Sequence, residues 1–219
     1  MTMSLAQPST AEGRADLLRS GGRADGRVGP NAAIQLLRVL PMVADPDTVR
    51  RILLTAGVPE WAVHAPVDMV DERSVAALHR VTRTILDKED GLFVLAEAGA
   101  LTGDYILANR IPGWARAALK ALPARICSRL LARAITAHAW TFVGSGRFVC
   151  SPTDGLSFEI WSNPLCLGEC SDAPICVWHA AVFQRLYQAL ASRTARVVET
   201  HCSARGDACC RFVVNGIRK

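Results

Sequence analysis

The sequence predicts an α+β fold, in which N-terminal helices pack with a largely antiparallel sheet formed by the second half of the chain. Two observations carry this prediction. Up to about residue 139 the apolar residues recur at helical spacing, and beyond it short alternating runs indicate strands. The second half then reads as two strands, a helix and two more strands, a β-β-α-β-β order that suits an antiparallel sheet.

Composition fits one domain with a sizeable core, because half of the 219 residues are hydrophobic. Residues 1–28 are rich in Gly, Ser, Ala and Arg and lack an apolar signal segment, so we expect a disordered tail. Residues 29–219 are expected to form a single domain, with a helical part at about 29–139 and an α+β part at about 140–217. No apolar run reaches membrane-span length, so we expect a cytoplasmic protein with reduced thiols.

Four helices are expected in the first part of the chain. Their approximate ranges are 32–40, 48–56, 71–87 and 91–109. Pro30 suits the first helix start, and Asp71 suits the N-cap of the third helix. The fourth range is an apolar helix or a broken helix pair, in which Gly99 and Gly103 allow another backbone or a ligand to approach closely.

A basic segment follows these helices. Residues 105–153 contain seven basic residues and no acidic one. On a helix spanning Pro123–Ala139, Arg125, Arg129 and Arg133 form one stripe, beside an apolar face. Three interpretations remain open: a solvated face, a site for ligand carboxylates, or contact with an anionic membrane surface. Nucleic-acid binding is not expected, because the stripe lacks interleaved aromatic residues and any recognisable module.

The second half of the chain should supply the sheet. Strands are expected at Trp140–Val143, Arg147–Cys150, Leu156–Trp161, Ala195–His201 and Arg211–Val214, with a helix at Ile175–Leu190. Gly206-Asp207 suits the tight loop of a final hairpin. This hairpin places Cys202 opposite Cys210 and turns Cys209 to the other face.

Cysteines are concentrated around this hairpin. Six of the chain's eight lie at Cys166, Cys170, Cys176, Cys202, Cys209 and Cys210. The facing pair of the hairpin would offer two sulfur ligands to one metal ion. A cluster of buried thiols without a metal remains an alternative. A disulfide is disfavoured, because nothing in the sequence indicates an oxidising compartment.

No motif for a redox cofactor appears in the chain. The sequence has no G-x-G-x-x-G between a strand and a helix and no G-x-x-x-x-G-K. No Ser/His/Asp spacing is diagnostic either. If the protein is a reductase, its electron donor is therefore unknown from the sequence.

The C-terminal strands and cysteines also resemble a known family. Residues 197–214, with Cys202, Gly206-Asp207 and Cys210, resemble the end of the 4-vinyl reductase domain family. Further stretches are similar to one branch, the bacteriochlorophyll 4-vinyl reductase proteins of photosynthetic bacteria. These stretches are Gly29-Pro30-Asn31, Ala96-Glu97-Ala98-Gly99, Thr102-Gly103-Asp104-Tyr105-Ile106-Leu107, Asn109-Arg110-Ile111-Pro112, His138-Ala139-Trp140-Thr141-Phe142 and Asn163-Pro164-Leu165-Cys166. The resemblance covers most of the chain from Gly26.

The resemblance implies a fold and a function. The fold would be the ligand-binding fold shared with a vesicle-tethering subunit and with phenol-sensor domains, usually a homodimer. The function would be in bacteriochlorophyll biosynthesis and photosynthesis, at the reduction of the vinyl group of divinyl (proto)chlorophyllide to ethyl. The chain would be the oxidoreductase itself or its tetrapyrrole-binding partner. A non-catalytic zinc-containing small-molecule sensor or pigment carrier is the alternative.

The same resemblance implies partners and a location. The partners would be the divinyl chlorophyllide-type pigment, a magnesium tetrapyrrole, and other enzymes of bacteriochlorophyll synthesis. No transmembrane span is implied, and peripheral contact with the photosynthetic membrane would suit a cytoplasmic protein that handles this pigment.

The phenol-sensor domains further imply a zinc site. They resemble sites in which zinc is held by one Glu and three Cys, and the three cysteines match Cys176, Cys202 and Cys210 here. The stretch that carries their Glu corresponds to 163–166, so Cys166 is the expected fourth ligand. Glu159, Cys170 and His179 are the substitutes. A site of four thiolates would be structural.

The pigment is expected between the helix Pro123–Ala139 and the sheet. His138 would be the axial magnesium ligand, with Trp140 beside it, and Arg125, Arg129 or Arg133 would bind a propionate. The alternative is a capping or buried histidine next to a solvated arginine stripe. His179 is the competing axial ligand, and the surroundings of Gly99–Gly103 are the competing site.

Overall fold

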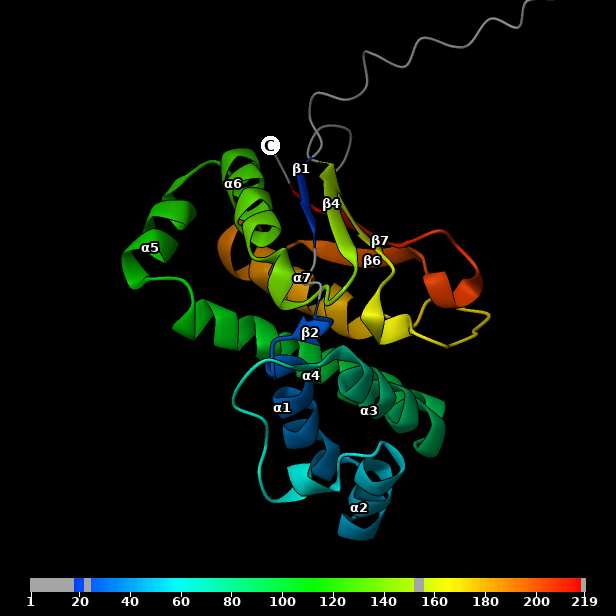
Figure 1. The fold of residues 1–219 in the computed structure, drawn as a ribbon. Helices are drawn as coiled ribbons and strands as arrows, with labels where there is room; N and C mark the ends of the chain where they lie inside the picture. The colour runs from blue at the N-terminus through cyan, green and yellow to red at the C-terminus, as the bar shows by residue number, and fades with distance from the viewer. Residues whose placement is uncertain (1–17, 22–24, 152–155, 218–219) are drawn as a thin grey trace, which may run out of the picture.

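The computed structural model describes residues 18–21, 25–151 and 156–217 and confirms the α+β class (Figure 1). The helices are α1 (Asn31–Val39), α2 (Pro46–Thr55), α3 (Glu72–Ile85), α4 (Lys88–Asn109), α5 (Gly113–Ala121), α6 (Ala124–Ala137) and α7 (Val177–Leu190). The strands are β1 (Leu18–Gly21), β2 (Arg27–Val28), β3 (Val70–Asp71), β4 (Arg147–Ser151), β5 (Ser157–Trp161), β6 (Arg196–His201) and β7 (Cys210–Asn215). The predicted β-β-α-β-β order is present as β4, β5, α7, β6 and β7.

The main sheet is antiparallel, with the strand order β1-β4-β5-β7-β6. Alternate residues point toward the helices, and register places Cys150 opposite Phe158 and Phe158 opposite Phe212. Helix α7 covers this face through Phe183, whose ring centroid lies 4.8 Å from that of Phe158. Helix α6 packs beside α7, against β1 and β4. The buried aromatic layer between the sheet and α7 is therefore the centre of the core.

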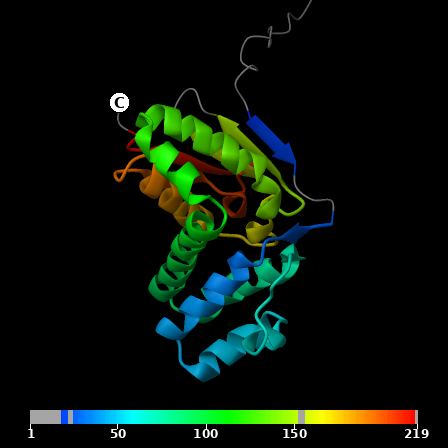
Figure 2. The same cartoon turned by 90° about the vertical axis from the view of Figure 1, so that its left-hand side faces the viewer.

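Helix α4 connects the sheet with a group of helices, α1 to α3, on its other side (Figure 2). It is one continuous helix that packs against both α7 and α1. A Cβ atom at Gly99 would lie 2.8 Å from the Cβ of Ala181, and one at Gly103 would lie 2.7 Å from the Cβ of Arg185. Both glycines therefore allow α7 to approach closely, and the space beside them holds protein rather than a ligand.

Within the described residues, α4 is long and apolar enough to cross a membrane by length and composition alone. Its packing between α1 and α7 is that of a core helix. Caps define the helix starts as expected, because the Asp71 carboxylate accepts a hydrogen bond from the backbone N–H of Arg73 at the start of α3.

Two details differ from the sequence-based expectation. The strand expected at Trp140–Val143 is wrong, since Ala139–Thr141 form a 3-10 turn. The N–H groups of Phe142 and Val143 donate to the carbonyl of Ala139, which leaves them no role in a ladder. Residues 18–21 and 27–28, within the expected disordered tail, pair as β1 and β2. The rest of that tail, residues 1–17 and 22–24, lies outside the described residues, apart from 25 and 26.

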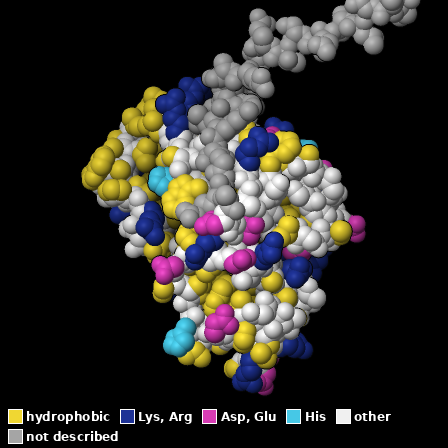
Figure 3. All heavy atoms as spheres, in the orientation of Figure 1, with side chains coloured by type: hydrophobic (Ala, Val, Ile, Leu, Met, Phe, Trp, Pro, Cys, Tyr) yellow, Lys and Arg dark blue, Asp and Glu magenta, His cyan; other side chains and the backbone are white. Residues whose placement is uncertain are grey.

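Helix α5 and helix α6 form a corner of the molecule next to the sheet. Figure 3 shows hydrophobic side chains gathered at this corner, beside Lys and Arg side chains. No residue of α5 is buried. On α6 the inner face, with Cys127, Leu131 and Ile135, is buried, and the arginine stripe points outward.

Candidate functional site

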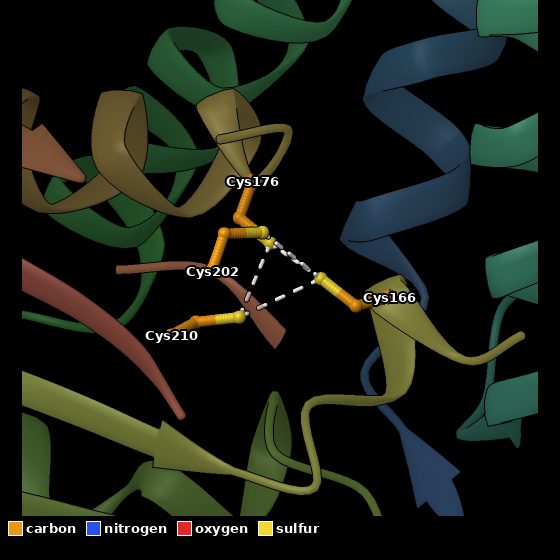
Figure 4. Close-up of side chains that lie close together, drawn as sticks. All are labelled: Cys166, Cys176, Cys202 and Cys210. Atoms are coloured by element: carbon orange, nitrogen blue, oxygen red, sulfur yellow. Dashed lines mark hydrogen bonds between the residues drawn. The ribbon is translucent and has the colours of Figure 1, made fainter. Parts of the chain in front are cut away.

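The structure brings four cysteines into one buried group, Cys166, Cys176, Cys202 and Cys210 (Figure 4). Their sulfur atoms all lie within 4.8 Å of one another. The sulfur of Cys166 lies 2.9 Å from that of Cys176, 3.5 Å from that of Cys210 and 3.8 Å from that of Cys202. Four sulfur atoms around one point are the ligand set of a tetrahedral thiolate site.

Each cysteine is positioned by the end of an element. Cys166 ends a 3-10 turn that begins at Asn163, whose side-chain oxygen accepts a hydrogen bond from the N–H of Leu165. Cys176 directly precedes α7. Cys202 directly follows β6, and Cys210 begins β7. Four rigid elements therefore converge on the group.

The C-terminal hairpin places its two cysteines as predicted. His201 pairs with Arg211, so Cys202 and Cys210 face each other at the end of the ladder. Gly206, with φ of +88°, turns the chain, and the Asp207 carboxylate accepts a hydrogen bond of 2.8 Å from the N–H of Cys202. Cys209 lies outside the four-cysteine group.

Donors from the chain are directed at the sulfur atoms. The side-chain amide of Asn163 donates to the sulfur of Cys176 at 3.3 Å, and the N–H of Ser203 donates to the sulfur of Cys210 at 3.3 Å. Such outer hydrogen bonds stabilise thiolates that bind a metal ion.

The electrostatics of the group favour a cation. The hydrogen bond with Cys166 lowers the pKa of Cys202 to about 6, and the same cysteine lowers the pKa of Cys210 below its usual range. Burial raises the pKa of Cys176 well above its usual value. The four buried groups therefore share protons unevenly, because four thiolates cannot ionise together without a compensating positive charge. A divalent ion would supply that charge, so the donor set fits a structural zinc ion.

Glu199 is a neighbour that the sequence did not single out. Its carboxylate accepts a hydrogen bond of 2.7 Å from the N–H of Cys176. Burial, and then Cys202 and Cys210, raise its pKa to about 9. Its direction could not be read from strand alternation, because the pairing register shifts between Glu199 and His201.

The substitutes for Cys166 lie elsewhere. The Glu159 carboxylate accepts a hydrogen bond from the indole N–H of Trp161, and Cys170 is exposed. His179 is buried against aromatic residues, and burial lowers its pKa to about 3. Among the described residues, only the four named cysteines form a group that could hold a metal ion.

His138 is exposed at the end of α6. Its Nδ1 lies 2.9 Å from the carbonyl oxygen of Ala134, one turn earlier. If Nδ1 carries the proton and donates it to this carbonyl, the lone pair of Nε2 is directed away from the helix and is available to a metal ion. Trp140 follows in the 3-10 turn and is partly exposed.

The arginines do not lie where the predicted pocket requires them. Arg125, Arg129 and Arg133 are on the exposed face of α6, whereas the space between α6 and the sheet is filled by its buried inner face. At 1.5 Å per residue, Arg125 lies about 20 Å and Arg129 about 13 Å from His138 along the helix axis. A pigment between α6 and the sheet could not reach these guanidinium groups, so any site that uses them is on the outside of α6.

Comparisons with known proteins agree with this layout. Residues 156–215 match the 4-vinyl reductase (V-4-R) domain, which includes β5, α7, β6, β7 and all four clustered cysteines. The chain is 47% identical over 186 residues to the bacteriochlorophyll synthase 23 kDa chain of Cereibacter sphaeroides, with 85% of this chain and 89% of that protein covered. It is 42% identical over 192 residues to the bacteriochlorophyll synthase 23 kDa chain of Rhodobacter capsulatus, with 86% and 87% covered.

Proposed function

We propose a function from one premise: the chain belongs to the family of the bacteriochlorophyll synthase 23 kDa chains and carries a 4-vinyl reductase domain. Identity of 47% over most of both chains supports a role in bacteriochlorophyll biosynthesis, and this observation carries the proposal. Within that role, the chain binds a divinyl (proto)chlorophyllide and presents its vinyl group for reduction to ethyl. It acts as the tetrapyrrole-binding partner of the reductive step.

The chemistry of the chain's own residues supports binding rather than reduction. The sequence has no nucleotide-binding fingerprint that would hold a nicotinamide or flavin donor. A zinc ion on four thiolates would supply structural charge only, because no position is left for water or substrate. The four cysteines would hold together the 3-10 turn at 164–166, the start of α7 and the hairpin of β6 and β7.

The pigment site that we propose is the outer corner at the end of α6. There Nε2 of His138 would be the axial ligand of the magnesium ion, and the ring of Trp140 would contact the macrocycle. Arg129 or Arg133 would bind the carboxylate of the pigment, since both lie on the exposed face of α6 nearer to His138 than Arg125 does. His138 is preferred to His179 because His179 is fully enclosed by the core.

A second function, a zinc-containing sensor or adaptor without a pigment, is favoured by the domain match and the cysteine group alone. The two functions differ in one measurement, the absorption spectrum of divinyl protochlorophyllide incubated with the purified chain. The proposal expects a saturable shift of the absorption band. No shift at saturating pigment would favour the sensor.

A second arm of that experiment separates carrier from reductase. NADPH or reduced ferredoxin is added to the complex of pigment and chain, and the loss of the vinyl group is followed. Binding without turnover supports the role as binding partner. Turnover by the chain alone would contradict that role and make it the reductase.

A further inference from the structure

The corner formed by α5 and α6 exposes apolar side chains that the core does not use. Trp114 is 77% exposed, and Leu122, Ile126 and Leu130 are 37%, 48% and 40% exposed. The two helices contact each other, so these residues belong to one continuous corner of the molecule (Figures 1 and 3). We call this set of four residues, together with the basic side chains beside them, the corner face.

The apolar residues of α6 form a second stripe on this helix. Ile126 and Leu130 are one turn apart and lie outside the buried stripe of Cys127, Leu131 and Ile135. Folding of the chain on itself has therefore covered one apolar stripe and left the other in solvent. An exposed apolar face of this kind on a surface helix marks a contact with another body.

The charge of the corner face is of one sign. Lys120, Arg125, Arg129 and Arg133 are exposed beside the apolar residues. Among the described residues, none of these four forms an ion pair with an acidic side chain. The whole segment 105–153 carries no acidic residue that could neutralise them.

We infer that the corner face binds the surface of an anionic lipid bilayer. The indole of Trp114 and the aliphatic side chains would enter the headgroup region, and the four cations would contact lipid phosphates. Amphipathic helices that lie on membranes combine these same features, an apolar stripe, an interfacial tryptophan and flanking Lys or Arg. The apolar part and the basic part of the face are thus explained by one partner.

A second copy of the chain fits the face less well. In a two-fold interface the same patch meets itself, so the four cations of one copy would face those of the other. Like charges opposed in this way disfavour association. A bilayer of anionic lipids offers the opposite charge together with an apolar interior.

The test is sedimentation of the purified chain, without pigment, with vesicles of two compositions. One is phosphatidylcholine alone, and the other contains phosphatidylglycerol as one third of its lipid. Binding is expected to the anionic vesicles, to weaken as salt is raised, and to be absent with the neutral vesicles. Equal binding to both vesicles, or to neither, would overturn the inference.

Matched variants locate the contact. Arg125→Gln, Arg129→Gln and Arg133→Gln combined should reduce the binding constant for anionic vesicles at least about tenfold. The control combines Arg38→Gln, Arg51→Gln and Arg73→Gln, which removes the same charge from exposed positions on α1, α2 and α3. An equal loss in both triple variants would mean that net charge, and not the corner face, binds the vesicles.

The apolar part is tested separately. Trp114→Ala should weaken binding to anionic vesicles several-fold, and the control Val63→Ala, at a side chain that is 78% exposed elsewhere, should leave it unchanged. Circular dichroism would verify that the variants are folded. If Trp114→Ala instead converts a dimer to a monomer and leaves vesicle binding unchanged, the face is an interface between copies and the inference is wrong.

Discussion

The carboxylate of Glu72 accepts two hydrogen bonds from Ser145, one from its backbone N–H and one from its hydroxyl, each of 2.7 Å. Glu72 begins α3 in the helical part, and Ser145 lies in the turn that leads into β4. The neighbouring Gly144 has φ of +55°, and a side chain there would collide with the same carboxylate. This pair therefore attaches the helical part of the protein to the sheet.

Glu72→Gln should destabilise the fold, because an amide cannot accept from both donors without turning its own N–H groups toward one of them. We expect a loss of about 1–3 kcal/mol in the free energy of unfolding, and a smaller loss for Ser145→Ala. Urea unfolding measures both. Glu60→Gln, at an exposed glutamate, is the control, and an equal stability of the Glu72 and Glu60 variants would refute the attachment.

Zinc content should depend on the clustered cysteines. Cys202→Ser and Cys210→Ser, made singly, should lose the ion and lower the stability of the domain, because metal binding and folding are coupled. The exposed Cys170 lies outside the group, so Cys170→Ser should keep the full metal content. Metal analysis after anaerobic purification decides this. Wild-type protein without metal, or full metal in both cluster variants, would contradict the site.

Gly99→Ala should separate α4 from α7. The new methyl group would lie 2.8 Å from the Cβ of Ala181 and closer still to the carbonyl oxygen of Trp178. We expect a loss of about 1–3 kcal/mol from overpacking, although alanine favours a helix. Gly113→Ala, at the open start of α5, is the matched control and should be neutral or slightly stabilising. Similar thermal midpoints for the two variants would contradict this packing.

Stability should fall in acid because of buried histidine. His79 is fully buried, its Nε2 lies 2.9 Å from the carbonyl oxygen of Ala32, and burial lowers its pKa to about 3 from the ordinary 6.5. Below pH 6.5 the unfolded chain therefore takes up a proton that the folded chain refuses. Each such proton reduces the free energy of unfolding by about 1.4 kcal/mol for every pH unit lost, down to about pH 3.

The measurement is urea unfolding between pH 7 and pH 5 for wild type, His79→Gln and His64→Gln. The pH dependence should be weaker by about one proton in the His79 variant and unchanged in the variant of the exposed His64. The same pH dependence in all three proteins would show that His79 is not responsible.

The sequence predicted those features that depend on local geometry. Strand alternation and the Gly206 turn were sufficient to place Cys202 opposite Cys210. The cap at Asp71 and the start at Pro30 were likewise local signals. Cys166 was assigned only through resemblance, because its position depends on the Asn163 turn and on packing against distant elements.

Other features are set by tertiary contacts and could not be read from the pattern. Helix α6 carries two apolar stripes, and only packing against β1, β4 and α7 selects Leu131 over Leu130 for the core. The expected strand at Trp140–Val143 failed because hydrogen bonds to nearby carbonyls compete with a ladder. Glu199 was missed because an irregular register hides its direction.

The central claim is that a magnesium tetrapyrrole binds at His138. The most direct test is to titrate wild type, His138→Ala and His64→Ala with divinyl protochlorophyllide and to compare the dissociation constants from the shifted absorption band. The predicted result is an affinity at least about tenfold weaker for His138→Ala only, with unchanged circular dichroism and zinc content in all three proteins. Equal affinity of His138→Ala and wild type would contradict the claim.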